Sequence, residues 1–280
     1  MNNVLYINKP KGITSFDICF KLRRVLNTKK IGHTGTLDPN ATGVMIVLFE
    51  GATKANQFLV SDTKKYTTEV LLGVETDTLD IDGNVIKECE YVIPEENTLR
   101  EALNSFEGKS MQEVPITSAL KVNGKKLYQY QLEGKEVELP VREIEVSQID
   151  LESMTDTGFI FSCTVSSGTY IRALVRDILK KLNLAGTVKE LRRDMVDNIL
   201  LEDCDSLDDI LNGKYTAHNL LDVLSKRYTV IDYEKGEDVK NGKRITLDCD
   251  DEKVVITNNG ELLAVYGKDG NEYKCVRGLW

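Results

Sequence analysis

The segment from Ile31 to Gly43 concentrates residue types that can do chemistry. It reads Ile-Gly-His-Thr-Gly-Thr-Leu-Asp-Pro-Asn-Ala-Thr-Gly, and its glycines permit sharp turns and close approach of the backbone to a ligand. His33, one of only two histidines in the chain, and Asp38 lie within that frame. A carboxylate on a tight loop beside basic sequence suits nucleophilic or general-base work. The alternative is that Asp38 caps a helix beginning at Pro39.

Several other chemistries lack the residues they need. The chain contains no Gly-x4-Gly-Lys-Ser/Thr run and no Gly-x-Ser-x-Gly motif, which argues against a phosphate loop and against a Ser-His-Asp hydrolase. An acidic stretch around Gly83 resembles a calcium loop, but Thr78 and Cys89 stand where its first and last carboxylates would be required. The six cysteines form no Cys-x-x-Cys pair, so we expect no metal site.

The charge of the chain is unevenly distributed. The 280 residues carry 36 Lys and Arg against 45 Asp and Glu, a net charge of −9, which argues against a non-specific DNA binder. Residues 1–70 nevertheless hold ten basic and five acidic side chains, and residues 166–193 hold seven against two. Two such basic islands can hold a polyanion locally. Because no long apolar segment occurs, we expect no membrane span and a cytoplasmic location.

Helices and strands in alternation must position these residues. The run Val44–Phe49 predicts a buried strand directly after the Asp38 loop, and Tyr66–Leu72 predicts another. Apolar residues at helical spacing predict a helix over Tyr170–Leu182. After Arg227, short strand-like runs separated by Gly and Asn turns predict a small β unit. We therefore expect a domain of residues 1–227 followed by one of residues 228–280.

The loop around Asp38 resembles the catalytic loop of TruB-type tRNA pseudouridine synthases. Further segments resemble other motifs of that family in the same order: Asn8–Ser15, Lys65–Asp80, Gln112–Gly124, Ser167–Leu174 and Leu191–Arg193. Two residues depart from the pattern. Val114 stands where the family usually has the first of two prolines, and Thr117 stands where an aromatic residue is common.

The resemblance implies a fold and a function. The fold would be α+β, with a mixed, largely antiparallel sheet and flanking helices, followed by a small β-barrel-like unit resembling a PUA domain in size and position. The activity would be isomerisation of uridine to pseudouridine at position 55 in the T-loop of tRNA. Because that reaction has no redox step, neither cofactor nor metal is implied. We expect a monomer that binds the T-arm without an obligatory protein partner.

The resemblance also implies a role for each matching residue. Asp38 would be the single catalytic residue, and Arg172 would pair with it and keep it ionised. His33 would help to extrude the target base from its stack. The uracil pocket would be lined by a stacking tyrosine and two further residues: Tyr66, Tyr170 and Leu191. Phosphate contacts would come from five cations: Lys9, Lys11, Lys121, Arg192 and Arg193.

Plainer alternatives stay open at this point. Tyr170 and Leu191 could pack in the core, His33 could be a structural loop residue, and Arg172 could be a surface cation at a helix start, although helix N-termini disfavour cations. The whole chain could be a non-catalytic tRNA-binding or tRNA-folding protein, a guide-dependent synthase, or a small-molecule hydrolase that uses Asp38. The chemical route, through C1′, C6 or the C2′ proton, is also open.

Overall fold

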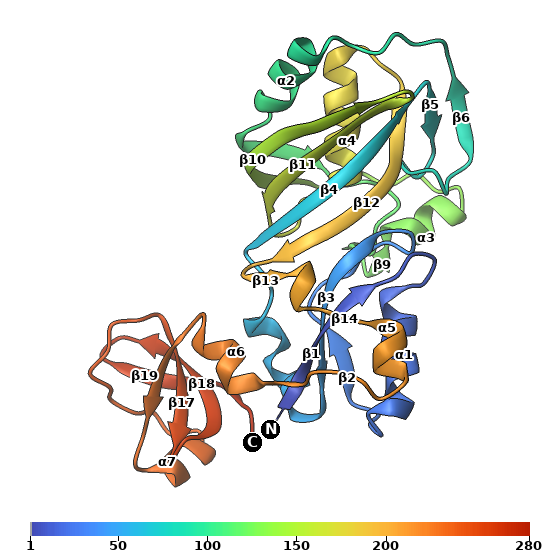
Figure 1. Ribbon diagram of the computed structural model, residues 1–280. Coiled ribbons are helices and arrows are strands. Elements are labelled where there is room, and N and C mark those ends of the chain that lie inside the picture. The colour runs from blue at the N-terminus through green and yellow to red at the C-terminus, as the bar shows by residue number, and fades with distance from the viewer. Residues whose placement is uncertain (1) are drawn as a thin grey trace. The chain divides into compact units, whose positions relative to one another are not determined.

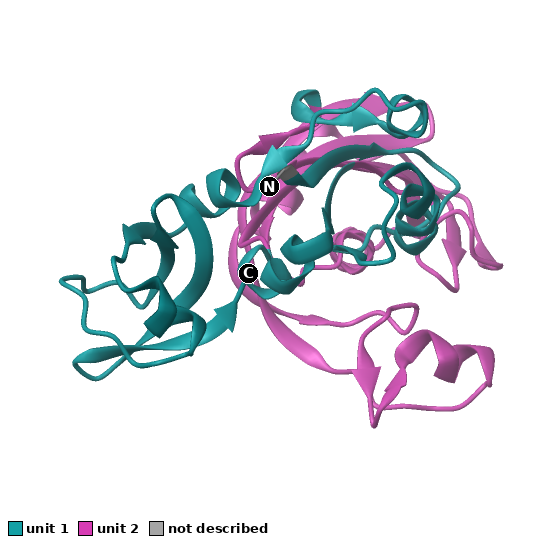
Figure 2. Cartoon of the chain, turned by 90° about the horizontal axis from the view of Figure 1, so that it is seen from below, with its two compact units in different colours: residues 1–39, 44–60, 202–280 teal, residues 40–43, 61–201 magenta. Residues whose placement is uncertain are grey.

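The computed structural model describes residues 2–280, which fall into two compact units (Figure 2). Each unit is assembled from segments far apart in the sequence. Unit 1 comprises residues 1–39, 44–60 and 202–280, and unit 2 comprises residues 40–43 and 61–201. Both units combine helices with strands, which confirms the predicted α+β class.

Unit 2 is built on an antiparallel sheet whose strands follow the order β12-β4-β11-β10-β7 (Figure 1). The strands and their bounds are β4 (Thr63–Leu72), β7 (Gly108–Glu113), β10 (Val141–Thr155), β11 (Gly158–Ser166) and β12 (Gly186–Val196). The short strand β13 (Ile199–Leu200) pairs with β12. Helices α2 (Glu96–Asn104) and α4 (Ile171–Leu182) contact each other as well as β10 and β12 respectively, so they cover the sheet together.

One parallel pairing makes this sheet a mixed one. Strand β3 (Thr42–Phe49) begins in unit 2, where Thr42 and Gly43 pair in parallel with Arg192 and Arg193 of β12. The prediction of a mixed but largely antiparallel sheet is therefore confirmed. The remaining elements of unit 2 are short: β5 (Val74–Thr76), β6 (Val85–Glu88), β8 (Lys121–Val122), β9 (Lys125–Lys126) and α3 (Leu127–Leu132).

The amphipathic pattern of residues 170–182 produces helix α4 as predicted. Its apolar face, which includes Leu174, Ile178 and Leu179, is buried. The helix ends at Asn183, whose φ of 55° places it in the left-handed region that commonly terminates helices. Tyr170 is the residue directly before the helix, so its backbone position is set by the start of α4.

Unit 1 begins with strand β1 (Asn2–Lys9) and helix α1 (Ser15–Val25). Thr14 caps α1 by accepting a hydrogen bond from the amide of Asp17. Strand β1 lies between β3 and β14 (Asp205–Ser206), and β2 (Ile31–His33) pairs with β3. The remaining elements of this part are η1 (Glu50–Phe58), α5 (Leu207–Leu211), β15 (His218–Asn219) and α6 (Leu220–Ser225).

Helices α1 and α5 contribute to a hydrophobic core of unit 1. Buried side chains from α1 meet apolar residues of β1, β3 and α5 there: Leu5, Ile7, Ile18, Cys19, Leu22, Met45, Val47, Phe49, Leu207 and Ile210. Burial on this scale is the main stabilising term for such a unit. It also holds α1 firmly beside the segment that carries Asp38.

A four-stranded sheet follows the main part of unit 1. Its order is β16-β17-β18-β19, with β16 and β17 parallel and the other pairs antiparallel. The elements are β16 (Thr229–Asp232), α7 (Gly236–Lys240), β17 (Lys253–Asn258), β18 (Glu261–Asp269) and β19 (Glu272–Gly278). They have a hydrophobic cluster of their own around Tyr266 and Tyr273. The sheet is compatible with a PUA-like domain.

The start of this sheet is tied back to the preceding part of unit 1. Arg227 donates hydrogen bonds to the carbonyl oxygens of Phe58 (3.1 Å) and Val60 (3.0 Å), and the Tyr228 hydroxyl donates to Phe58 as well (3.1 Å). The rings of Phe58 and Tyr228 meet edge to face. The division at residue 227 stays a prediction, but these bonds fix the chain on both sides of it.

Among residues 2–280, no helix is both long and apolar enough to cross a membrane.

The close approach of Gly43 to β12 generates a test of the sheet. Gly43 has a φ of +102°, and a Cβ atom there would lie 2.1 Å from the carbonyl oxygen of Arg193. We expect Gly43→Ala to separate the two strands and lower the free energy of unfolding by more than about 3 kcal/mol, measured by urea denaturation. Gly270→Ala is the matched control, because Gly270 has a φ of +67° and open space around it. That control should cost only about 1–2 kcal/mol, and equal losses would contradict the steric account.

Candidate active site

The loop that carries Asp38 is held from both sides by the segment between β1 and α1. On the C-terminal side, the carbonyl oxygen of Pro39 accepts hydrogen bonds from the Lys9 ammonium (2.7 Å) and from the Gly12 amide (3.0 Å). Gly12 adopts a φ of +80° to present that amide, a conformation that favours glycine. The Asn8–Ser15 motif therefore acts as a support for the loop.

On the other side of Asp38, Leu37 is fixed by the first residue of α1. The Ser15 hydroxyl accepts a hydrogen bond from the Leu37 amide (3.0 Å) and lies 3.2 Å from the Leu37 carbonyl oxygen, to which it donates. Ser15 and Leu37 are both buried. With its two neighbours held in this way, the half-buried Asp38 has a defined backbone position, which is what a catalytic side chain requires.

The helix-cap alternative for Asp38 is wrong. Residues 39 and 40 form a turn, and the chain then enters strand β3 at Thr42. No helix follows Asp38 in this part of the described chain, so its carboxylate has no helix terminus to cap. The Asp-Pro pair opens a tight turn between two strands.

His33 lies at the opposite end of the same loop. It is the last residue of β2, stands opposite Val47 of β3, and is half-buried. The next amide, of Thr34, donates to the Ile46 carbonyl oxygen at 3.1 Å. Strand pairing therefore fixes where His33 leaves the sheet, and one loop of unit 1 carries both His33 and Asp38.

In unit 2, a buried arginine joins three segments of the sequence. The Nη1 atom of Arg172 donates to the Thr78 carbonyl oxygen (2.7 Å) and to the Thr117 hydroxyl (2.7 Å), while Nη2 donates to the Thr117 carbonyl oxygen (3.0 Å). Only 5% of Arg172 is exposed, so the surface-cation alternative is wrong. A buried guanidinium is stable only where its charge and its donors are satisfied.

Asp80 supplies the opposite charge that the sequence pattern does not reveal. Its Oδ2 atom lies 3.6 Å from Arg172 Nε, and its Oδ1 atom accepts from the Thr78 hydroxyl at 2.6 Å and from the Asp82 amide at 3.2 Å. The charge pattern around Asp80 suggests only a turn or a calcium loop that lacks its end ligands. The signal that could have identified Asp80 is its place in the Lys65–Asp80 motif.

The departure at Thr117 has a structural consequence. The Thr117 hydroxyl accepts a hydrogen bond from the Arg172 guanidinium. The same hydroxyl also lies 3.4 Å from the Thr78 carbonyl oxygen. The departure at Val114 is explained by its amide, which donates to the Pro140 carbonyl oxygen at 2.9 Å. A proline at position 114 could not make that bond.

Tyr170 is held by a side chain from a different strand. Gln112 of β7 accepts from the Tyr170 amide (2.8 Å) and donates to the Tyr170 carbonyl oxygen (3.1 Å). Gln112 is buried, and the Arg142 guanidinium lies over the Tyr170 ring, 5.8 Å from its centroid. Tyr170 itself stays half-exposed, so simple core packing does not describe it.

Tyr66 and Leu191 lie on adjacent strands of the unit 2 sheet. Tyr66 of β4 stands opposite Arg193 of β12, and Leu191 stands opposite Thr68, two residues further along β4. Side chains at such positions share one face of a sheet. Tyr66 is 7% exposed and Leu191 is half-buried. The structure therefore places these two predicted pocket residues side by side.

Two of the predicted phosphate contacts are contradicted by burial. Lys9 is fully buried, and its ammonium donates to the Pro39 and Pro10 carbonyl oxygens. Arg193 is only 2% exposed. Burial, together with the positive charge of Arg193, lowers the pKa of Lys64 to about 8. The side chains of Lys9 and Arg193 are therefore enclosed in the interior, where a phosphate cannot reach them. The other three candidates are exposed: Lys11, Lys121 and Arg192.

No group of three or more metal-ligating side chains occurs within residues 2–280.

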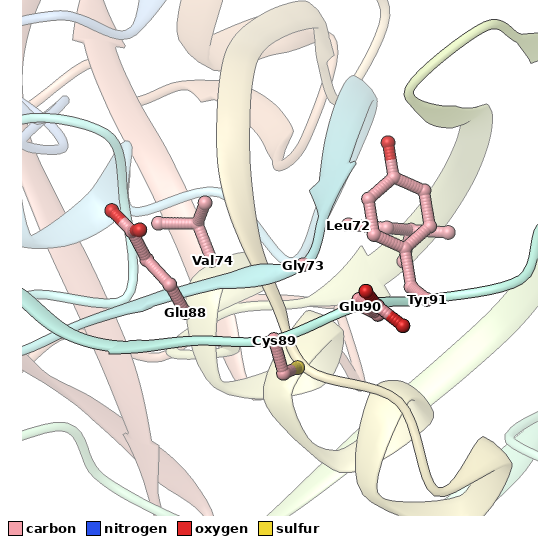
Figure 3. A pocket seen from close by; sticks show the side chains of 7 residues that line it. All are labelled: Leu72, Gly73, Val74, Glu88, Cys89, Glu90 and Tyr91. Carbon is pink, nitrogen blue, oxygen red and sulfur yellow. The ribbon is translucent and has the colours of Figure 1, made fainter.

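An open hollow of unit 2, of about 770 Å³, lies between the end of β4 and the segment after β6 (Figure 3). Its lining includes the carboxylates of Glu88 and Glu90 and the ring of Tyr91. None of the predicted site residues lines it, and its acidic rim is unsuited to a polyanion.

Two solved structures have a similar fold. One is a chain in the structure of an H/ACA RNP bound to a substrate RNA containing 2′-deoxyuridine, with a TM-score of 0.73, 20% identity, and coverage of 100% of this chain and 85% of that one. The other is a chain in a Cbf5-Nop10-Gar1 complex, with a TM-score of 0.72, 20% identity and the same coverage. At this identity the likeness establishes the pseudouridine synthase fold alone.

Sequence comparison gives closer relatives. Residues 23–171 match the model of the TruB family pseudouridylate synthase N-terminal domain. The tRNA pseudouridine synthase B of Lactobacillus acidophilus is 38% identical, covering 98% of this chain and 97% of the relative. The protein of the same name from Bacillus anthracis is 40% identical, covering 95% and 92%. The chain therefore belongs to the TruB family of pseudouridylate synthases.

Proposed function

We propose that the chain isomerises uridine to pseudouridine at position 55 in the T-loop of tRNA, with Asp38 as the catalytic carboxylate. Membership of the family makes the chain a pseudouridine synthase. The observation that supports tRNA as the substrate is the match, over nearly the whole chain, to relatives named tRNA pseudouridine synthase B. The position within tRNA and the role of Asp38 rest on the motif resemblance.

The proposed reaction breaks the N1–C1′ glycosidic bond, turns the uracil, and joins C5 to C1′. The hydrogen on C5 is released as a proton and N1 gains one, so the isomerisation is balanced without a cofactor. Asp38 acts on C1′, on C6 or on the C2′ proton, and the three routes share one requirement. The carboxylate must be held in a fixed position, which the bonds to Leu37 and Pro39 support.

Other residues take the parts that the resemblance gives them. Arg172 is the electrostatic partner of Asp38, and its hydrogen bonds in unit 2 support a fixed orientation of its guanidinium. Extrusion of the target base, which chemistry on a stacked base requires, falls to His33. The uracil is enclosed by a tyrosine that stacks on it and two neighbours: Tyr66, Tyr170 and Leu191. Exposed cations hold the backbone: Lys11, Lys121 and Arg192.

The decisive experiment is an activity assay of the pure protein on an unmodified T-arm stem-loop, reading tritium released from C5-labelled uridine. Turnover supports the proposal. A requirement for a guide RNA would favour a guide-dependent synthase, and binding without turnover would favour a tRNA-binding protein. Monomeric state, the absence of a cofactor and the role of residues 228–280 in tRNA binding stay predictions.

Asp38→Asn preserves the shape of the side chain and removes its reactivity. We expect turnover to fall by about 10⁴-fold or more, because the essential carboxylate is lost. Binding of tRNA in a filter assay should be retained. Asp208→Asn, which neutralises an exposed carboxylate on α5, is the control and should leave turnover unchanged. Substantial residual turnover in Asp38→Asn would contradict the assignment of Asp38 as the catalytic carboxylate.

Arg172→Lys keeps the charge but loses the planar group. A lysine cannot reproduce the bonds to Thr78 and Thr117 made by two separate nitrogen atoms. We expect kcat to fall by about 10²-fold, the scale of losing one well-placed electrostatic group. A lysine variant within about threefold of the wild-type rate would mean that Arg172 does not orient the carboxylate.

Thr117 is a positioning residue for Arg172, and its hydroxyl can be removed without changing its shape. Thr117→Val should lower kcat by about tenfold, because a hydrogen bond to a charged group is lost while the backbone bond remains. Thr117→Ser should restore the rate, and KM should change little in either variant. If valine and serine variants behave alike, the hydroxyl has no positioning role.

A further inference from the structure

Helix α1 carries an exposed aromatic face that the proposed active site does not use. Phe16 is 65% exposed and Phe20 is 62% exposed. They stand four residues apart, so they share one face of the helix. The opposite face, with Ile18, Cys19 and Leu22, is buried in the core of unit 1. Exposed aromatic side chains that recur on one face indicate contact with a partner more strongly than a single one does.

Cations lie beside one of these rings and elsewhere on the same helix and the loop after it. The Arg23 guanidinium lies 5.6 Å from the centroid of the Phe20 ring, and Lys21 and Arg24 are exposed on the same helix. The loop after α1 adds exposed Lys29 and Lys30. The single acidic side chain of the helix, Asp17, is engaged with the hydroxyl of the capping Thr14. Helix α1 and the loop after it are therefore strongly basic beside an aromatic face, on a chain whose net charge is −9.

This combination matches the chemistry of unstacked RNA bases. Bases displaced from a helix stack on aromatic rings and on guanidinium planes, while nearby cations hold the phosphates. A second copy of the same face is a poorer partner, because two basic surfaces repel each other. Charge complementarity therefore favours a nucleic acid over self-association.

We propose that Phe16, Phe20 and Arg23 form a stacking surface for an unpaired nucleotide of the substrate RNA. The inference rests on the proposed function, since it takes the same tRNA as its ligand. The position of the helix fits that role, because Ser15 at its first turn holds the backbone of Leu37, next to Asp38. RNA bound on α1 and the catalytic loop are thus connected through one rigid element of unit 1.

The rings can be tested separately from the charges. The double variant Phe16→Ala/Phe20→Ala should weaken tRNA binding by about 10-fold to 100-fold, the range expected when stacking on one or two rings is lost. The dependence of its affinity on salt concentration should stay as in the wild type. Arg24→Gln should instead change the plot of the logarithm of the association constant against the logarithm of the salt concentration. Its slope should become shallower by about 0.7–0.9 for each phosphate that this side chain neutralises. Val92→Ala removes an exposed apolar side chain elsewhere (82% exposed) and should change neither quantity.

Variants that keep an aromatic ring at both positions should restore tRNA binding. Phe16→Tyr/Phe20→Tyr keeps two stacking surfaces and should bind within about threefold of the wild type. The alanine variant should keep the wild-type melting temperature, because both side chains lie outside the core. Its kcat at saturating tRNA should also be unchanged, with the loss appearing in KM.

Several outcomes would overturn the inference. Unchanged tRNA affinity in the double alanine variant would show that the face does not bind RNA. A change confined to oligomeric state, measured by light scattering, would assign the face to a second copy of the chain. Failure of the proposed function itself would look different, because the wild-type protein would then not convert uridine in the T-arm stem-loop.

Discussion

The burial of the Arg172 guanidinium is the constraint on which unit 2 depends. A cation that is 5% exposed must find its partners inside the protein, and these come from the Thr78–Asp80 turn and from Thr117. The turn is also fixed to β12, because the Ile81 amide donates to Val188 and the Val188 amide donates to Leu79. Three motifs separated by up to 94 residues are therefore held in one place by one side chain.

The loop of Asp38 is positioned by a different means. Its flanking residues are bonded to the backbone and side chains of the segment from Lys9 to Ser15, and α1 itself is anchored by apolar burial. Hydrogen bonds define the local geometry there, while the hydrophobic core supplies most of the stability. This division explains why a short, polar motif such as Asn8–Ser15 accompanies the loop although none of its residues is proposed to react.

Apolar periodicity is a local property, so it predicts helices and buried strands well. Helix α4 and the run within β3 appear where expected. Strand β12 is not predicted, since its middle reads Lys-Glu-Leu-Arg-Arg-Asp. Its charges are satisfied by neighbours on β4, as Lys189 pairs with Glu69 at 2.7 Å and Asp194 accepts from Thr67 at 2.6 Å. Such cross-strand pairs cannot be recognised from one strand alone.

A similar limit applies to what a basic island indicates about RNA. Residues 166–193 carry seven cations, yet Arg172 and Arg193 are buried and Arg176 pairs with acidic neighbours. A cation can contribute to RNA affinity only where it is exposed, and an ion pair with a protein carboxylate reduces that contribution. In α1 the apolar half of the helix faces the core and leaves Lys21 and Arg24 outside. Amphipathicity, which sorts residues by face, therefore separates exposed cations from buried ones, which a count of charges along the sequence cannot do.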